Sequence, residues 1–464
     1  MMKVFNSLSQ RVEELAPIEP GHIRLYTCGP TVYNYAHIGN YRAYIFEDLL
    51  RRTLKFFGLR VTQVMNLTDV DDKTIRGARA AGLPLAAFTR PFCEAFFADL
   101  RTLAIEPAEH YPAATDHIPE MIALIARLLE KGVAYRSPDG SIYFRIEAFP
   151  EYGKLAHLDR SGLRAGARVA QDEYDKENAA DFALWKAWDE QDGEITWDSP
   201  WGRGRPGWHI ECSAMSMKYL GESFDLHTGG IDNLFPHHED ELAQAEAATG
   251  KPFVRTWMHC AHLVVEGRKM SKSLGNFYTL RDVLTRGYSG REMRLVLIGA
   301  HYRQALDFSF AALDAARASL QRLDAFRARL IGVTAGQTAA VLPQWAGLAE
   351  RDFGAALADD LGIAEALAAL FTMVTSGNRA LDADGVAPPE AAAVLALLTR
   401  MDSVLGFLEP EAAAAPPELL ALLDARQAAR KAKDWAEADR LRQEITRQGW
   451  VIEDTPKGPR LKKG

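Results

Sequence analysis

The fold is decided by a stretch that begins Ile23-Arg24-Leu25-Tyr26-Thr27-Cys28-Gly29-Pro30. Its first five residues predict a strand, which Gly29-Pro30 ends. A helical pattern then runs over residues 38–57, and a second strand is predicted over residues 61–67. Residues at steps of four share one face of the helix: Tyr41, Ile45, Leu49, Thr53 and Phe57. A strand, a helix and a strand in this order predict a parallel βαβ unit of an α/β fold.

Polar residues follow both predicted strands. Cys28 and Thr31 come after the first strand, and Thr68 and Asp69 come after the second. All four are therefore expected at the carboxyl edge of the sheet, where ligands bind in open α/β folds.

The start of the predicted helix carries His37, Gly39 and Asn40. Free backbone N–H groups and the positive end of the helix dipole attract phosphate at such a position. Gly39 lets a ligand approach the backbone closely.

A second candidate for phosphate binding is the stretch Lys269-Met270-Ser271-Lys272-Ser273, which Gly275-Asn276 follows. Two ammonium groups on flexible stems can follow phosphate oxygens as they move, and the serine hydroxyls add hydrogen bonds. Taken alone, the same pentapeptide favours a solvated surface loop, and it is the second phosphate-type element at residues 30–40 that favours phosphate binding.

Together, residues 30–40 and 269–273 resemble the two signature motifs of class I aminoacyl-tRNA synthetases. The resemblance implies an α/β fold, with a Rossmann-like nucleotide-binding domain, an inserted subdomain, an α-helical bundle and a small C-terminal domain. It implies catalytic roles for His37, Lys269 and Lys272. The first signature usually ends in a second histidine, and this chain has Asn40 there, which still donates a hydrogen bond. The implied nucleotide-binding residues are Thr31, His37, Asn40, His227, Gly229, Gly230, Asp232 and Lys272.

Composition favours an ordinary globular protein of several domains, since 464 residues are 48% hydrophobic and 25% charged. The N-terminus has no long apolar run, and nowhere do about 18 apolar residues occur together without charges, so we expect a cytoplasmic protein with no membrane segment. The four cysteines are too few for a disulfide framework and form no C-x-x-C pair. They are either ligands or core residues.

The order of patterns along the chain, taken with the resemblance, implies six parts. Residues 224–230 and 257–263 look like short strands of a resumed α/β pattern, after a mixed segment with a helix near residues 121–131 and a strand over residues 142–146. The six parts are the first half of the Rossmann-like domain (1–115), the inserted subdomain (116–205), the second half (206–268), a signature-loop and stem-contact region (269–315), a helical bundle (316–410), and a linker with a small basic tRNA-binding domain (411–464).

The last 44 residues differ in charge from the rest of the chain. Residues 421–464 carry eleven Lys or Arg against seven Asp or Glu, although the whole chain has a net charge of -8. This asymmetry indicates a polyanion partner or, equally well, a solvated helical face. Trp435 and Trp450 are candidates for stacking on bases.

A metal site is the feature that separates specificities within the class. His237 and Glu241 are four residues apart and share a helical face, and Cys28 and Cys212 add two thiols. The four side chains would suit a tetrahedral zinc ion, although each cysteine by itself is as well explained as a buried small residue. Residues 27–33, 207–213 and 224–241 resemble the corresponding stretches of the cysteinyl-tRNA synthetase family, in which the four matching positions bind zinc. The resemblance covers essentially the whole chain, including residues 433–439.

A metal would explain how cysteine is told apart from serine, since a shape-fitting pocket separates them by only about one to three kcal/mol. A metal deprotonates a coordinating thiol, whereas a hydroxyl is a harder and poorer ligand. We assign this metal no role in bond making. Trp208 is expected to wall the side-chain pocket and Thr68 to hold the polar end of the substrate; the alternatives are a core aromatic and a strand-end cap.

The resemblance implies one Zn²⁺ per chain, ATP with Mg²⁺ and cysteine as substrates, tRNA(Cys) as partner, and a monomer. Cysteine would first form its adenylate and then pass to the 2′-hydroxyl at the 3′ end of the tRNA. Two alternatives share much of the chain. Cysteine ligases of mycothiol biosynthesis carry both signatures and the zinc site but are shorter and lack the tRNA-binding end. A non-catalytic tRNA-binding paralogue would be expected to lose His37 or Lys272, and both are present.

Overall fold

The structure is a computed structural model that describes residues 2–158, 181–271, 274–334, 336–339, 341–383, 385–408, 416–455 and 458–463. The chain divides into two compact units, Met1–Gly406 and Phe407–Gly464, and each is described by itself.

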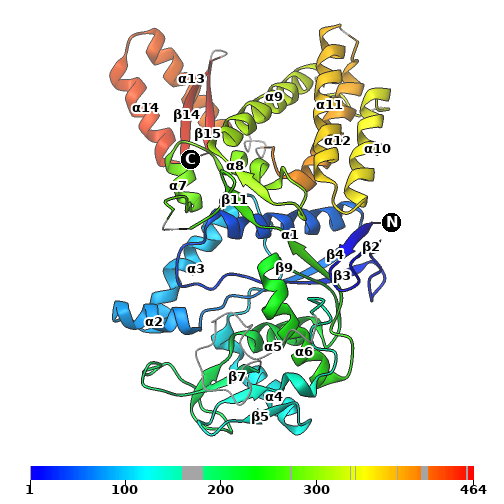
Figure 1. Cartoon of the computed structure of the whole chain (residues 1–464). Coiled ribbons are helices and arrows are strands. Elements are labelled where there is room, and N and C mark those ends of the chain that lie inside the picture. The colour runs from blue at the N-terminus through cyan, green and yellow to red at the C-terminus, as the bar shows by residue number, and fades with distance from the viewer. Residues whose placement is uncertain are drawn as a thin grey trace. The chain divides into compact units, whose positions relative to one another are not determined.

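The first unit is built around a parallel sheet of four strands in the order β10-β9-β3-β4 (Figure 1). The strands are β3 (His22–Thr27), β4 (Arg60–Met65), β9 (Phe224–Gly230) and β10 (Val254–Cys260). The α/β class is confirmed, as is the strand over residues 224–230. The strand predicted over residues 257–263 is wrong in its bounds, because β10 pairs with β9 along its whole length and β9 sets where it begins and ends.

Helix α1 (Ile38–Phe56) connects β3 to β4 and lies close to its predicted range. Its first turn is closed by two reciprocal hydrogen bonds. The Asn40 N–H donates to Nδ1 of His37 at 3.2 Å, and the His37 N–H donates to Oδ1 of Asn40 at 3.0 Å. Such a capping box satisfies two backbone donors that a helix start leaves unpaired. Asn40 therefore has a structural role at the very position where it replaces a histidine.

The other elements of the parallel-sheet region are β1 (Lys3–Asn6), β2 (Arg11–Glu14), α2 (Asp72–Ala81), α3 (Leu85–Thr102), α5 (Trp208–Leu220) and α6 (Glu239–Thr249). The first two strands form an antiparallel hairpin. Helix α5 precedes β9, and α6 connects β9 to β10, so both begin near the carboxyl edge of the sheet.

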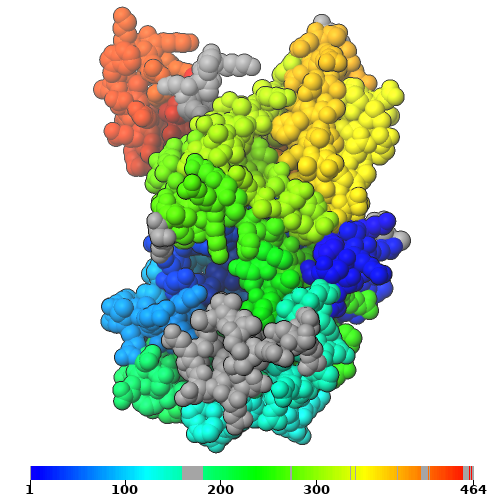
Figure 2. Space-filling model, in the orientation of Figure 1, coloured from blue at the N-terminus to red at the C-terminus, as the bar shows by residue number. Residues whose placement is uncertain are grey.

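The inserted segment forms an antiparallel sheet in the order β5-β6-β7-β8, with α4 before it. Its elements are α4 (Ile118–Glu130), β5 (Ala134–Arg136), β6 (Ile142–Phe144), β7 (Phe182–Ala187) and β8 (Gly204–Pro206). Residues 159–180 of the predicted inserted subdomain lie outside the described residues. In the space-filling view this segment (cyan to green) lies at one end of the first unit, and the helices after residue 290 lie at the other (Figure 2).

After the parallel sheet comes a small sheet in the order β12-β11-β13, followed by helices. Its strands are β11 (Leu263–Val265), β12 (Arg268–Lys269) and β13 (Leu306–Phe308). The helices are α7 (Leu280–Thr285), α8 (Gly290–Ile298), α9 (Phe310–Thr334), α10 (Gln344–Ala358), α11 (Ile363–Asp382) and α12 (Pro388–Leu405). The helical character predicted for residues 316–410 is confirmed for the described residues, which form most of α9 and all of α10, α11 and α12.

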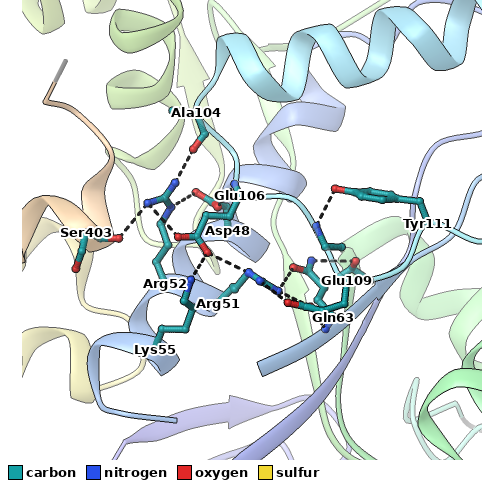
Figure 3. A network of polar contacts seen from close by, with 12 residues as sticks. Asp48, Arg51, Arg52, Lys55, Gln63, Ala104, Glu106, Glu109, Tyr111 and Ser403 are labelled. Carbon is teal, nitrogen blue, oxygen red and sulfur yellow. Dashed lines mark hydrogen bonds and ion pairs between the residues drawn. The ribbon is translucent and has the colours of Figure 1, made fainter. Parts of the chain in front are cut away.

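A network of ion pairs and hydrogen bonds fastens α1 to its neighbours (Figure 3). Arg52 of α1 donates to Asp48 one turn earlier at 2.8 Å, to the Ala104 carbonyl at 2.7 Å and to the Ser403 carbonyl at 3.0 Å. Arg51 binds both carboxylate oxygens of Glu109, at 2.8 and 2.7 Å. Helix α1 is thereby joined to the end of α12 and to the segment that follows α3.

Arg294 of α8 completes this network from inside the core. Its side chain is fully buried, and it donates to the Leu405 carbonyl at 2.6 Å, to the Leu103 carbonyl at 2.9 Å and to the carboxylate of Asp48. A further bond goes to the Ala104 carbonyl at 3.2 Å, and a buried guanidinium is tolerated because these acceptors and the Asp48 charge compensate its loss of solvation. Three segments distant in sequence are held at one point on α1.

The second unit consists of α13 (Pro417–Lys431), α14 (Trp435–Arg447) and an antiparallel hairpin of β14 (Trp450–Thr455) and β15 (Gly458–Lys463). Its core contains Leu419, Leu423, Ile445, Trp450 and Leu461. The expectation that Trp450 is available for base stacking is wrong, because only 6% of it is exposed. Trp435 is 61% exposed and keeps its candidacy.

Within the described part of the chain, no helix combines the length and the apolar character needed to cross a membrane.

Candidate metal centre and active site

Four elements converge at the carboxyl edge of the parallel sheet and bring the predicted metal ligands together. Cys28 follows β3, Cys212 lies in the first turns of α5, His237 lies in the turn before α6, and Glu241 lies in the first turn of α6. One ligand atom from each lies within 4.8 Å of the other three, and all four residues are buried. Two thiols, an imidazole and a carboxylate in this arrangement fit a zinc ion.

His237 and Glu241 form an ion pair within the cluster, with Nε2 of His237 3.0 Å from Oε1 of Glu241. Burial opposes a charge on His237, but Glu241 and Cys212 outweigh it and raise the pKa of His237 to about 10. Burial likewise opposes ionisation of Glu241, but His227 and His237 lower its pKa to about 2. At neutral pH the metal-free pair is an imidazolium and a carboxylate.

The two thiols differ in acidity. Burial and the hydrogen bond with Cys212 hold the pKa of Cys28 well above its usual range. Burial also acts against ionisation of Cys212, but its hydrogen bond with Cys28 and the neighbouring His237 lower its pKa to about 6. One thiol of the pair is therefore ready to bind a cation at neutral pH, and the other must first lose its proton.

A layer of histidines surrounds the cluster, and sequence reasoning missed most of it. Nε2 of His238 lies 3.2 Å from Sγ of Cys28, and its Nδ1 lies 2.8 Å from Nε2 of His259. Nδ1 of His209 lies 2.8 Å from Nδ1 of His237. A second possible set of metal ligands, Cys28, His227, His238 and Glu241, shares two members with the first. The available sequence signal was the concentration of histidines in residues 209–259.

His227 lies with this layer, although it was predicted to contact the nucleotide. It is fully buried, its Nε2 lies 3.0 Å from Oε2 of Glu241, and its ring stacks on Trp257 at 4.6 Å between centroids. The structure therefore places His227 against a metal-ligand candidate and not on a surface that a nucleotide can reach. The sequence could not show this, because both faces of β9 are covered and its residues do not alternate between buried and exposed.

The two residues predicted for the substrate pocket both lie beside the cluster. Trp208 is 36% exposed and stacks on His237, with 4.1 Å between ring centroids and 22° between ring planes. It is not a core aromatic. Thr68 is buried, and its hydroxyl bonds with Asn66 and Glu211. Glu211, which the sequence analysis did not single out, has its second carboxylate oxygen buried without a hydrogen-bond partner among the described residues.

The two signature motifs contact each other at the start of α1. The Ile38 N–H donates to the Tyr278 carbonyl at 2.9 Å, and the His37 ring packs edge-on against Phe277 at 5.2 Å. Gly39 faces Met270 so closely that an added Cβ would lie 3.0 Å from the methionine Cε. The loop after β12 is held by Asn276, which accepts from the Ser271 N–H at 2.8 Å.

The signature lysines lie in or beside this loop. Lys269 is exposed at the end of β12, and Lys272 lies outside the described residues. His37 is partly exposed, and burial lowers its pKa while Asp232 opposes that shift, so the imidazole is neutral at pH 7. Asp232 is exposed beyond the end of β9, where Gly229 and Gly230 complete the strand.

Comparisons with known proteins agree with this fold. Residues 14–318 match a family model described as the tRNA synthetases class I (C) catalytic domain, and residues 352–409 match the DALR domain. A solved methionyl-tRNA synthetase of Mycobacterium tuberculosis, in complex with methionyl-adenylate, has the same fold, with a TM-score of 0.62 at 16% identity over 83% of this chain and 92% of that one. Fold and signatures define the class I aminoacyl-tRNA synthetases.

Within that class the relatives carry one specificity. The cysteine–tRNA ligase of Protochlamydia amoebophila is 53% identical over 100% of this chain and 98% of its own length. That of Chlamydia pneumoniae is 50% identical over 99% of this chain and 97% of its own length. Residues 412–459 match a cysteinyl-tRNA ligase anticodon binding domain. The chain belongs to the cysteine–tRNA ligase family, which decides against the amino-sugar ligase and against a non-catalytic paralogue.

Proposed function

We propose that Cys28, Cys212, His237 and Glu241 hold one zinc ion per chain, and that this centre selects cysteine. The observation that carries the proposal is the convergence of their four ligand atoms within 4.8 Å at a buried point of the sheet edge. Bound there, the ion supplies a soft Lewis acid that favours a deprotonated thiol over a hydroxyl. The donor set fits, because a site of this composition binds zinc more readily than the hard cations that prefer oxygen.

The chain's own residues shape the pocket beside this centre. Trp208 stacks on His237 and leaves about a third of its surface exposed, so it forms a wall that a small side chain can reach. Thr68 lies three residues after the end of β4, and its hydroxyl donates to Glu211 of α5, the helix that Trp208 begins. We assign the pocket between them to the cysteine substrate.

Activation of cysteine needs positioning and charge stabilisation more than covalent chemistry. The substrate carboxylate attacks the α-phosphate of ATP in line, and pyrophosphate leaves with Mg²⁺. His37 is neutral and partly exposed at the start of α1, so its N–H can donate to a phosphate oxygen. Lys269 and Lys272 neutralise the charge that builds up on the leaving phosphates. Asn40 contributes by capping the helix that carries His37.

The nucleotide is assigned to the opposite side of the same edge. Thr31 pairs with Thr68 in an isolated parallel bridge, which fixes the backbone beside the pocket. Gly229 and Gly230 end β9, and the exposed carboxylate of Asp232 suits the ribose hydroxyls. We do not include His227 among these contacts, because Glu241 already binds it.

Transfer to tRNA(Cys) then follows at the terminal 2′-hydroxyl, and the C-terminal unit contributes to recognition of the tRNA. The exposed ring of Trp435 and the basic residues of α13 and α14 support that contact. The six-part division of the chain, the monomeric state and the cytoplasmic location stay predictions.

The test combines metal content with substrate choice. Purified protein should contain one zinc per chain and exchange labelled pyrophosphate into ATP with cysteine but not with serine. Cys212→Ser should lose zinc and cysteine-dependent exchange together. Cys93→Ser is the matched control, since Cys93 lies outside the cluster and should retain both. Retention of zinc and exchange by Cys212→Ser would overturn the metal assignment.

A further inference from the structure

A chain of three hydrogen bonds, formed through the side chains of Asn66, Thr68 and Glu211, connects the two segments that carry the thiols of the proposed zinc site. The Gly29 N–H donates to Oδ1 of Asn66 at 2.9 Å, Nδ2 of Asn66 donates to the Thr68 hydroxyl at 3.1 Å, and that hydroxyl donates to Oε2 of Glu211 at 3.0 Å. No role is predicted for Asn66 or Glu211 from the sequence.

The direction of this chain is set at its first member. A backbone N–H can only donate, so the Asn66 amide must present its oxygen to Gly29 and its nitrogen to Thr68. The Thr68 hydroxyl then accepts from Asn66, and its single proton goes to Glu211. No member can be reversed without leaving a donor facing a donor.

Burial makes this chain of hydrogen bonds costly to break. The exposed fractions are 2% for Asn66, 1% for Thr68 and 0% for Glu211. Water cannot replace a lost partner at such positions, and a buried polar group left unsatisfied costs about 1–3 kcal/mol. The three hydrogen bonds therefore form a rigid connection between Gly29 and Glu211.

Its two ends are the immediate neighbours of the two thiols. Gly29 directly follows Cys28, and Glu211 directly precedes Cys212. The Gly29 end is also sterically fixed, because a Cβ on this residue would lie 1.7 Å from the Asn66 carbonyl oxygen. The chain thus spans from the segment after β3, across the end of β4, to the first turn of α5.

We infer that Asn66, Thr68 and Glu211 are positioning residues for the metal centre, which hold the Cys28 and Cys212 backbones at the separation that one ion requires. This inference rests on the zinc site proposed above. Partners that orient metal ligands from outside the coordination sphere typically contribute 10–100-fold to metal affinity. A preformed pair of thiols avoids the ordering that the ion would otherwise have to impose.

The inference gives Thr68 a different role from a direct substrate contact, and the two are separable. If Thr68 contacts the substrate directly, replacing it should weaken cysteine binding and leave zinc binding unchanged. If Thr68 is a positioning residue, replacing it should lower the affinity for zinc, even when no cysteine is present.

Two pairs of variants test this. Thr68→Val removes the hydroxyl at nearly constant shape, while Thr68→Ser keeps it. Glu211→Met removes the acceptor, while Glu211→Gln keeps a carbonyl oxygen for Thr68. Zinc affinity of the metal-stripped full chain is measured by competition with a chromophoric chelator, and thermal unfolding of the same samples shows whether each variant is folded.

We expect Thr68→Val and Glu211→Met to weaken zinc binding by about 10–100-fold, and Thr68→Ser and Glu211→Gln to stay within about threefold of the parent chain. If Thr68→Val does not fold, the Glu211 pair alone decides. Unchanged zinc affinity in a folded Thr68→Val or Glu211→Met would overturn the inference. Failure of the parent chain to bind zinc at all would instead overturn the zinc site itself.

Discussion

The indole of Trp208 stacks on the imidazole of His237, with 4.1 Å between ring centroids and 22° between ring planes. The wall of the proposed cysteine pocket is thereby in direct contact with a proposed zinc ligand, and the first turn of α5 is fixed against the turn before α6. In the proposed site, this contact would couple the fit of the substrate to the geometry of the metal ligands.

Replacing Trp208 should therefore weaken cysteine binding. We expect Trp208→Ala to raise the KM for cysteine in pyrophosphate exchange by about tenfold, because an aromatic stack contributes about 0.5–1.5 kcal/mol beyond its buried area. Trp208→Phe keeps a ring over His237, so its KM for cysteine should lie between that of the parent chain and that of Trp208→Ala. An unchanged KM in Trp208→Ala would show that the indole does not wall the pocket.

Zinc affinity should rise with pH. The pKa of His237 is raised to about 10, and burial holds that of Cys28 above its usual range, so both carry protons at pH 7 in the metal-free chain. Ligands bind zinc only when deprotonated, so binding should release about two protons at this pH. The pKa of Cys212 is about 6, so below this pH zinc binding should release a third proton and zinc affinity should depend more steeply on pH.

Calorimetry in buffers of different ionisation enthalpy measures this proton release directly. A binding enthalpy that does not depend on the buffer would contradict the assignment of these two protons.

The signature lysines should affect the rate of adenylate formation. Lys272→Ala is expected to slow pyrophosphate exchange by about 10²–10³-fold, the usual loss when one donor to a developing charge is removed, and Lys269→Ala by less. Arg268→Ala is the matched control, since Arg268 is an exposed neighbour in β12 with no assigned role. Equal effects of all three changes would point to net charge in place of specific contacts.

The buried pair of Arg294 and Asp48 should be important for stability. Arg294→Leu is expected to lower the free energy of unfolding by about 3 kcal/mol, because it leaves Asp48 and three carbonyl groups with fewer donors. Arg351→Ala removes an exposed pair and should change it by less than about 0.5 kcal/mol. Denaturant unfolding followed by circular dichroism compares the two variants. If both change the free energy of unfolding by a similarly small amount, the buried pair does not contribute to stability.

Trp435 should contribute to tRNA binding. Trp435→Ala is expected to raise the Kd for tRNA(Cys) by about fivefold or more, since a stacked base contributes about 1–3 kcal/mol. Trp435→Phe retains a stacking surface and should lose less. Filter binding at fixed salt measures both, and a Kd unchanged in Trp435→Ala would remove this residue from the tRNA interface.

Some of the site was readable from the sequence because its geometry is local. His237 and Glu241 are four residues apart, and a helical turn brings such a pair together even though α6 itself begins only at Glu239. The βαβ unit around α1 was readable for the same reason, since strand and helix periods and their glycine and proline boundaries are written in consecutive residues.

Other features were misjudged because burial is not local. His227 and Trp450 both have residue types that suit ligand contacts, yet one packs against Glu241 and Trp257 and the other completes the core of the C-terminal unit. Nothing in their neighbours along the chain distinguishes these positions from exposed ones.

The sequence by itself determined the α/β class, the two signature motifs and the family, because these depend on short patterns and on their order. Only the tertiary structure decided how closely the four predicted ligand atoms of Cys28, Cys212, His237 and Glu241 approach one another. It alone also decided that Met270 covers Gly39, and that Asn66, Thr68 and Glu211 connect the two thiol-bearing segments. Those relationships join residues far apart in the chain. Their distances follow from how α5 and α6 pack against the ends of β3 and β4, which no local pattern specifies.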